Sequence, residues 1–242
     1  MKRYAVFVAC CTLLVVMSGA AVTSSHDHYR TLHTAAAVVD AVLIGGLCAW
    51  RRAGWGSLAL LAVDAGLGWF QGGPVTGTLH AVLAALLFAS IVAVALPQGE
   101  LDLVRDYGRP SLRFLSSAAV FLVLVQIGFG AGLRHSAVGV MPHLLGALVV
   151  AIFIMIVGAF VTTQFPKHAS LRPLAVAFMV ITGVQVFLGM GAFFMRMMNT
   201  SGSMVFLVIS VAHVANGSLT LATGVMLAME IRRSVLPREE SG

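Results

Sequence analysis

The chain has 242 residues, of which 59% are hydrophobic and only 10% are charged. Its mean hydropathy is +0.97, which excludes an ordinary water-soluble protein and predicts an integral membrane protein. The formal net charge of +6 reports membrane topology rather than nucleic-acid binding, because the basic residues gather in the connections between apolar segments.

Eight apolar segments follow in chain order, and each is expected to be a helix, because hydrocarbon offers backbone groups no water. We place them at about residues 4–22, 31–50, 54–71, 77–96, 113–133, 141–163, 172–196 and 203–231. The predicted fold is an all-α integral membrane protein with eight transmembrane helices in two duplicated four-helix bundles. The N-terminal half spans residues 1–97, a cytoplasmic linker 98–112, and the C-terminal half 113–242.

The basic residues predict the orientation of these segments. Only Arg30, Arg134 and Arg196 fall on one side of the eight-helix arrangement. The other side carries Lys2, Arg3, Arg51, Arg52, Arg105, Arg109, Arg113, Lys167, Arg172, Arg232, Arg233 and Arg238. By the positive-inside rule both termini are expected in the cytoplasm of a bacterial-type cytoplasmic membrane.

The first segment also resembles a cleavable secretory signal peptide. Lys2 and Arg3 precede an apolar run, and small residues follow at 18–21. An internal repeat favours its retention, because removing this segment would leave seven helices without a complete pairing.

The repeat relates the outer ends of the odd-numbered segments. Segment five carries Gln126, Gly130 and Gly132, and segment seven repeats the same spacing at 185, 189 and 191. Segment three is aligned through its glycine pair Gly66 and Gly68, and segment one through the stretch 18–21. Such small residues either admit a wide, flat ligand or let neighbouring helices pack closely.

One histidine lies at nearly the same depth in each even-numbered segment: His33, His80, His143 and His213. An imidazole within hydrocarbon is costly unless it is paired, hydrogen-bonded or bound to metal. A single such histidine is more often structural, but four at one depth favour metal ligands. Because no cysteines or carboxylates cluster with them, iron in a porphyrin fits better than a closed zinc site.

Residues 126–143, QIGFGAGLRHSAVGVMPH, resemble the heme A synthase or cytochrome oxidase assembly family. The family pattern there is a glutamine, small residues, an Arg-His pair and an axial histidine that opens the sixth helix. Gln185, Gly189 and His213 match more loosely. The resemblance covers the eight-helix architecture and is specific only in the second half, so the chain looks like a shortened, divergent member.

The resemblance implies a b-type heme as an electron-transfer cofactor between His143 and His213. Heme O, the substrate, would lie between His33 and His80, and oxidation of its C8 methyl group would give heme A. The implied partners are a heme O synthase as heme donor, a membrane electron donor and the cytochrome oxidase assembly machinery.

The first outer loop, residues 22–31, departs from the family pattern. The family usually carries a catalytic glutamate there and often a cysteine pair, whereas this loop has neither. Asp27 is its only carboxylate and therefore the candidate catalytic residue. Arg30 and Arg134 are candidate ligands for heme propionates, because guanidinium binds carboxylate through two hydrogen bonds. The alternative function is a non-catalytic diheme b-type protein for electron transfer or heme carriage.

Two carboxylates, Asp40 and Asp64, fall inside predicted spans and are expected to face the interior. Asp40 lies two turns after His33 on nearly the same helix face. Either a proton-transfer or orienting role or an ordinary interhelical hydrogen bond is open for it, and the hydrogen bond is favoured for Asp64.

Overall fold

A computed structural model of the chain describes residues 2–24, 29–50, 54–70, 72–95 and 102–237. Over these residues it contains eight α-helices and two short β-strands. They are α1 (Lys2–Ser24), α2 (Arg30–Trp50), α3 (Trp55–Phe70), α4 (Pro74–Ala95), β1 (Val104–Arg105), α5 (Leu112–Arg134), α6 (Val140–Gln164), α7 (Leu171–Met197), α8 (Met204–Ser234) and β2 (Val235–Leu236).

The prediction of an all-α membrane protein is confirmed. Seven of the described helices are long and apolar enough to cross a membrane. The exception is α3, whose 16 residues extend only about 24 Å at about 1.5 Å per residue. That is short of a hydrocarbon layer about 30 Å thick. The third predicted span is therefore a shorter apolar helix, while the other predicted segments agree closely with the observed helices.

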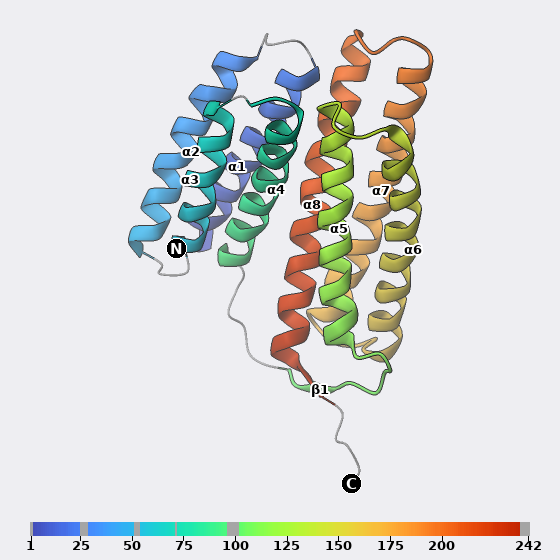
Figure 1. Ribbon diagram of the computed structural model, residues 1–242. Coiled ribbons are helices and arrows are strands. Elements are labelled where there is room, and N and C mark those ends of the chain that lie inside the picture. Colours follow the sequence, from blue (N-terminus) through green and yellow to red (C-terminus); the bar gives the residue numbers. More distant parts are fainter. Residues whose placement is uncertain (1, 25–28, 51–53, 71, 96–101, 238–242) are drawn as a thin grey trace.

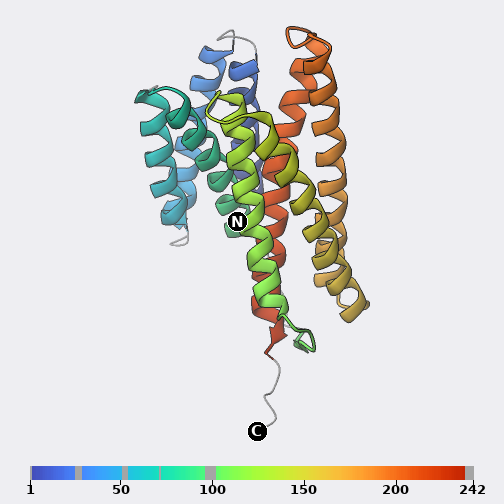
Figure 2. The ribbon, with the colours of Figure 1, turned by 45° about the vertical axis from the view of Figure 1, so that its right-hand side comes forward.

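The helices form two groups, α1–α4 and α5–α8, which lie side by side (Figures 1 and 2). The long helix α8 holds them together, since it packs against α1 and α4 of one group and against α5 and α7 of the other. Its buried face is rich in small residues, which allow close helix approach: Ala215, Gly217, Ser218, Thr220, Ala222, Thr223 and Gly224.

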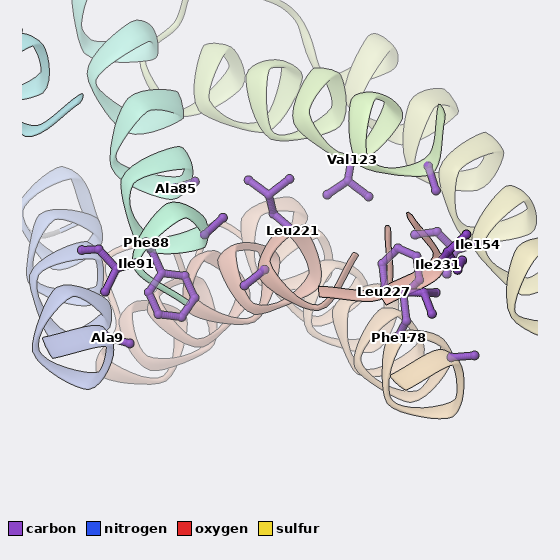
Figure 3. Close-up of a cluster of buried hydrophobic side chains, with 14 of the residues drawn as sticks. Ala9, Ala85, Phe88, Ile91, Val123, Ile154, Phe178, Leu221, Leu227 and Ile231 are labelled. Carbon is purple, nitrogen blue, oxygen red and sulfur yellow. The ribbon is translucent and has the colours of Figure 1, made fainter. Parts of the chain in front are cut away.

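The hydrophobic core continues across the boundary between the two groups (Figure 3). Phe88 and Ile91 of α4 are buried on one side of α8, and Leu221 of α8 is fully buried beside them. Toward the other end of α8, Leu227 and the neighbouring Phe178 of α7 are buried in the same cluster. The two halves therefore share one apolar core.

The last residues of the odd-numbered helices and the first residues of the even-numbered helices lie at the same end of the bundle, the upper end in Figure 1. The first turn of α1 and the last turn of α8 lie toward the other end. The backbone thus has the alternating arrangement that the sequence predicted, and the assignment of the lower end to the cytoplasm remains a prediction from the charge distribution.

The described residues of the linker between the halves are mostly exposed, but the linker is also held against the C-terminal half. Val104 and Arg105 form a parallel pair with Val235 and Leu236 at the end of α8. Asp106 is only 3% exposed. Its carboxylate accepts hydrogen bonds from the backbone N–H groups of Gly108 (2.9 Å) and Leu112 (2.7 Å). The linker is thus attached to the lower end of the C-terminal half.

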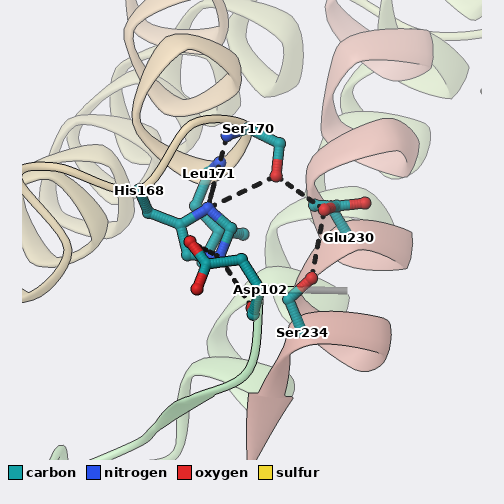
Figure 4. Close-up of polar contacts among 6 residues, drawn as sticks. All are labelled: Asp102, His168, Ser170, Leu171, Glu230 and Ser234. Atoms are coloured by element: carbon teal, nitrogen blue, oxygen red, sulfur yellow. Dashed lines mark hydrogen bonds and ion pairs between the residues drawn. The ribbon is translucent and has the colours of Figure 1, made fainter. Parts of the chain in front are cut away.

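A second polar cluster at this end surrounds the buried His168 (Figure 4). Its Nδ1 accepts from the backbone N–H groups of Ser170 (3.3 Å) and Leu171 (3.2 Å), which begin α7. Its Nε2 lies 3.1 Å from the carbonyl oxygen of Asp102. The Ser170 hydroxyl donates to Glu230 of α8 at 2.6 Å. His168 therefore caps α7 and fastens the linker.

Replacing Asp106 by alanine is expected to destabilise the protein by about 2 kcal/mol, because two buried N–H groups lose a charged acceptor. Thermal unfolding of the purified protein in detergent measures this. Asp102→Ala is the matched control, because the Asp102 side chain is 63% exposed and its carboxylate lies 3.8 Å from Nε2 of His168. The shorter contact with His168, at 3.1 Å, comes from the backbone carbonyl, which alanine keeps. Equal melting temperatures for the two variants would contradict the role assigned to the Asp106 carboxylate.

Candidate functional site

The structure brings the four predicted histidines together as two pairs. In the N-terminal half, the rings of His33 on α2 and His80 on α4 have centroids 6.3 Å apart and an interplanar angle of 77°. In the C-terminal half, the rings of His143 on α6 and His213 on α8 are 6.1 Å apart at 86°. The two halves therefore repeat one arrangement with nearly the same dimensions.

This separation fits two imidazoles that share one metal ion. Each metal–nitrogen bond is about 2 Å long and each ring centre lies about 1 Å beyond its nitrogen, so two opposed ligands have centroids about 6 Å apart. Among the described residues, no group of three or more histidine, cysteine, aspartate or glutamate side chains is placed to hold a metal. The remaining ligands of such an ion would have to come from a group such as porphyrin, which supplies four nitrogens.

Each histidine ring lies against a glycine of the preceding odd-numbered helix. In all four cases the nearest ring atom to a β-carbon built on that glycine would be Cε1. The pairs are Gly19 with His33 (3.0 Å), Gly68 with His80 (3.1 Å), Gly130 with His143 (2.9 Å) and Gly189 with His213 (2.9 Å). A side chain at any of these positions would press on the ring. The glycines therefore set the position of the imidazoles as well as allowing the helices to approach.

In the N-terminal half the polar partners fix the protonation of both rings. The Ser18 hydroxyl lies 3.0 Å from Nδ1 of His33 and donates its single hydrogen to the Val15 carbonyl (2.8 Å), so it accepts from the ring. Nδ1 of His80 lies 3.1 Å from the Asp64 carbonyl oxygen and 2.8 Å from Asp64 Oδ1, both acceptors when the carboxylate is ionised. Both Nδ1 atoms thus carry hydrogen, which leaves each Nε2 lone pair for a ligand bond.

The C-terminal half uses amides in the equivalent positions. The Gln126 amide nitrogen lies 3.0 Å from Nδ1 of His143 and donates to the His143 carbonyl at 2.8 Å. The Gln185 amide lies 3.3 Å from Nε2 of His213 and is oriented by Asn216, which donates to Gln185 Oε1 at 2.8 Å. Nδ1 of His213 is buried without a well-placed partner. His213 must therefore release the Gln185 amide before Nε2 can bind a metal.

The polar partner stands four residues before the ring-contacting glycine in three of the four helices: Asp64 with Gly68, Gln126 with Gly130, and Gln185 with Gly189. By its ring contact Gly68, and not Gly66, corresponds to Gly130. The alignment of the glycine pairs from the sequence was therefore wrong by two residues. A β-carbon at Gly66 would meet nothing within 4 Å. The spacing itself was present in the sequence and, applied to segment three, would have identified Asp64 as the counterpart of the two glutamines.

The histidines stand at different distances from the starts of their helices. His33 and His143 lie three residues after the first residues of α2 and α6, whereas His80 lies six residues after Pro74 and His213 nine residues after Met204. The predicted start of the eighth segment, residue 203, agrees with α8 within one residue. The predicted start of the fourth segment, residue 77, is three residues late, because the first turn of α4 contains proline, threonine and glycine.

Arg134, a predicted propionate ligand, makes its described contacts with α1. Its guanidinium donates to the Ala20 carbonyl (2.7 Å) and to the hydroxyls of Thr23 (2.5 Å) and Ser24 (3.0 Å). It therefore satisfies the last turn of α1 and joins the two halves at their outer end. Arg30, the other predicted propionate ligand, begins α2 with an exposed side chain, one turn before His33.

His135, at the end of α5, reaches from the C-terminal half to the N-terminal site. A β-carbon on Gly77 of α4 would collide with the His135 ring, so the ring lies directly against the first turn of α4. Burial lowers the pKa of His135, and the nearby Arg134 and His80 lower it further. The neutral ring therefore covers the helix end that carries His80, a contact that the sequence did not indicate.

Of the predicted carboxylates, Asp27 lies outside the described residues, as do its neighbours His26 and His28. Asp40 is 2% exposed and accepts a hydrogen bond from the Thr12 hydroxyl of α1 at 3.1 Å. For Asp40 the interhelical hydrogen bond is thus the observed interaction. Asp64, for which such a bond was favoured, makes its interhelical contact with a histidine of the site, His80.

A surface pocket of about 640 Å³ opens at the end of the C-terminal half where α5 is followed by α6. It is bordered by Leu133 of α5, by Val138 and Val140 before and in the first turn of α6, and by Phe193 and Arg196 of α7. Because Val140 is one turn before His143, the pocket lies on the outer side of the C-terminal histidine pair.

No family model matches the chain, and no protein of curated function is similar to it in sequence.

Proposed function

We propose that the chain is a diheme membrane oxidoreductase of the heme A synthase type. One observation carries the proposal: two histidine pairs, one in each half, have ring centroids 6.3 and 6.1 Å apart, the separation of two imidazoles on one metal ion. Bound heme would supply redox-active iron and a porphyrin that provides the other four ligands.

In this proposal His143 and His213 hold a b-type heme, and His33 and His80 hold heme O as substrate. The N-terminal half offers the Nε2 lone pairs of His33 and His80 to heme O. In the C-terminal half the amides of Gln126 and Gln185 must release the rings of His143 and His213 before their Nε2 atoms bind the b-type heme. The glycines position the rings, and the apolar helix faces exclude water.

Two successive hydroxylations of the C8 methyl group of heme O, each using one molecule of O2 and two donated electrons and releasing one water, would give a hydrate. Loss of water from this hydrate would leave the formyl group of heme A for cytochrome oxidase assembly. A heme O synthase would supply the substrate, and a membrane donor would supply electrons.

The difference between the two halves supports an assignment of different roles. In the N-terminal half both rings donate through Nδ1, to a hydroxyl and to an aspartate. In the C-terminal half the partners of both rings are neutral amides, and one of them contacts the metal-binding nitrogen itself. A protein that only carried electrons through two equivalent hemes would not need this difference.

The second candidate is a non-catalytic diheme protein for electron transfer or heme carriage. It is favoured by the pairing of histidines in both halves, because two axial imidazoles leave iron no open position for oxygen. The two candidates share the fold and the ligands, so only the fate of heme O separates them.

The test is to purify the protein in detergent after co-expression with a heme O synthase and to identify its extracted hemes by chromatography and mass. The enzymatic function predicts heme A or its hydroxylated precursor, and Asp27→Ala tests the predicted catalytic residue. Heme B alone, with supplied heme O left unchanged, would favour the second candidate. Protein without any heme would refute both.

A further inference from the structure

The inference concerns Asp64 and rests on the proposed function, because it describes how the protein would tune a heme held by His33 and His80. Asp64 lies on α3, four residues before Gly68, and is only 6% exposed. Its Oδ1 is 2.8 Å from Nδ1 of His80, and its backbone oxygen is 3.1 Å from the same nitrogen. Since Oδ1 has no well-aligned donor, the backbone oxygen takes the hydrogen bond and the carboxylate acts through its charge.

This charge distinguishes Asp64 from the polar partners of the other three histidines, two of which, Gln126 and Gln185, stand at the same spacing from their glycines. The equivalent partners of His33, His143 and His213 are the hydroxyl of Ser18 and the amides of Gln126 and Gln185, all neutral. Among the described ion pairs Asp64 takes part only in the one with His80. A carboxylate in this buried position therefore acts most directly on His80, and its charge also reaches His33 of the same pair. Among the described ion pairs no second cation neutralises it.

A buried anion beside the outer nitrogen of an axial histidine changes the metal site in two ways. It holds the hydrogen on Nδ1, which fixes the tautomer and raises the basicity of Nε2. It also favours the more positive oxidation state of the iron, because charges interact strongly where water is excluded. Amides can orient a ring but bring no net charge.

We propose that Asp64 is a positioning residue that holds His80 as an electron-rich ligand and gives the N-terminal heme a lower reduction potential than the C-terminal heme. The two halves of the bundle then share one ligand geometry but differ electronically. The N-terminal heme is the one kept more readily in the ferric state.

The experiment uses the full-length protein with heme B as the probe, produced in a host without heme O synthase so that both sites take the same heme. Redox titration followed by heme absorption gives two potentials, and His143→Ala identifies the N-terminal heme by removing the other. Asp64→Asn is expected to raise the reduction equilibrium constant of the N-terminal heme at least tenfold, about 59 mV for one electron. The C-terminal potential should not change, and Asp64→Glu should restore most of the shift.

The reciprocal variant Gln126→Glu places a carboxylate on the side chain whose amide lies 3.0 Å from Nδ1 of His143. This is the same ring nitrogen that Asp64 faces on His80. This variant should lower the C-terminal potential by a similar factor. If Asp64→Asn loses its N-terminal heme, the glutamate variant still tests the inference. An unchanged C-terminal potential in that variant would then overturn the role assigned to Asp64.

The outcomes separate the inference from the function on which it rests. A wild-type protein without heme refutes the proposed function and the inference together. A protein that binds two hemes whose potentials are equal, or in which Asp64→Asn shifts both potentials alike, leaves the proposed function standing and overturns the role of Asp64.

Discussion

Replacing His143 by alanine is expected to lower the heme-to-protein ratio of the purified protein by half and to leave the N-terminal heme spectrum intact. The physical reason is that His143 and His213 form a pair separate from His33 and His80. The substitution therefore removes an axial ligand from the C-terminal half alone. Alanine provides no nitrogen for the iron. The pyridine hemochrome assay, together with protein quantification, measures the ratio.

The reverse variant, His80→Ala, should remove the N-terminal heme and preserve the C-terminal one. His168→Ala is the matched control, because His168 is also buried but caps α7 at the opposite end of the bundle. Unchanged heme content in both ligand variants would show that the paired histidines are structural. A similar loss in His168→Ala would mean that the losses follow from general destabilisation.

Replacing Gly130 by alanine is expected to weaken heme binding at the C-terminal site about tenfold. The added β-carbon would lie 2.9 Å from Cε1 of His143, closer than carbon atoms tolerate. The ring must therefore turn or move. A displacement that costs about 1–3 kcal/mol corresponds to roughly one to two powers of ten in affinity. Heme titration of the heme-depleted protein measures the change.

Gly128→Ala is the control for this prediction. It lies on the same helix two residues earlier, and its β-carbon would meet nothing within 4 Å. The same comparison at the N-terminal site pairs Gly68→Ala, expected to weaken heme binding through His80, with the open position Gly66→Ala. Equal effects within each pair would contradict the role of the glycines as supports for the rings.

Both predictions depend on the contact between a glycine and a histidine ring. This contact repeats in both halves, while the polar partners of the rings differ. The glycine and histidine positions recur four times with contacts of nearly the same length. The partners of the rings are a hydroxyl, a carboxylate and two amides. Because the ring positions repeat, we infer that both sites bind the same type of ligand. Because the polar partners differ, we infer that the two sites have different roles.

The sequence by itself determined the class of protein, the approximate positions of the helices and the four histidines as candidate ligands. Hydropathy and helix length are local properties, so segments of about 20 apolar residues are visible without knowledge of their neighbours. His33 and His143 were correctly placed near helix starts because both follow short polar connections. The pairing of the histidines within each half also agreed with the prediction.

Only the tertiary structure decided which side chains meet across helices. Whether Gly68 or Gly66 faces His80 depends on the rotation of α3 against α4, which hydropathy does not report. The contact of Asp64 with His80, the use of Arg134 to close α1, and the pairing of β1 with β2 likewise join segments that are far apart in the chain. Such contacts are set by helix rotation and close packing rather than by local composition, and this is why the sequence indicated the histidines but not the groups that hold them.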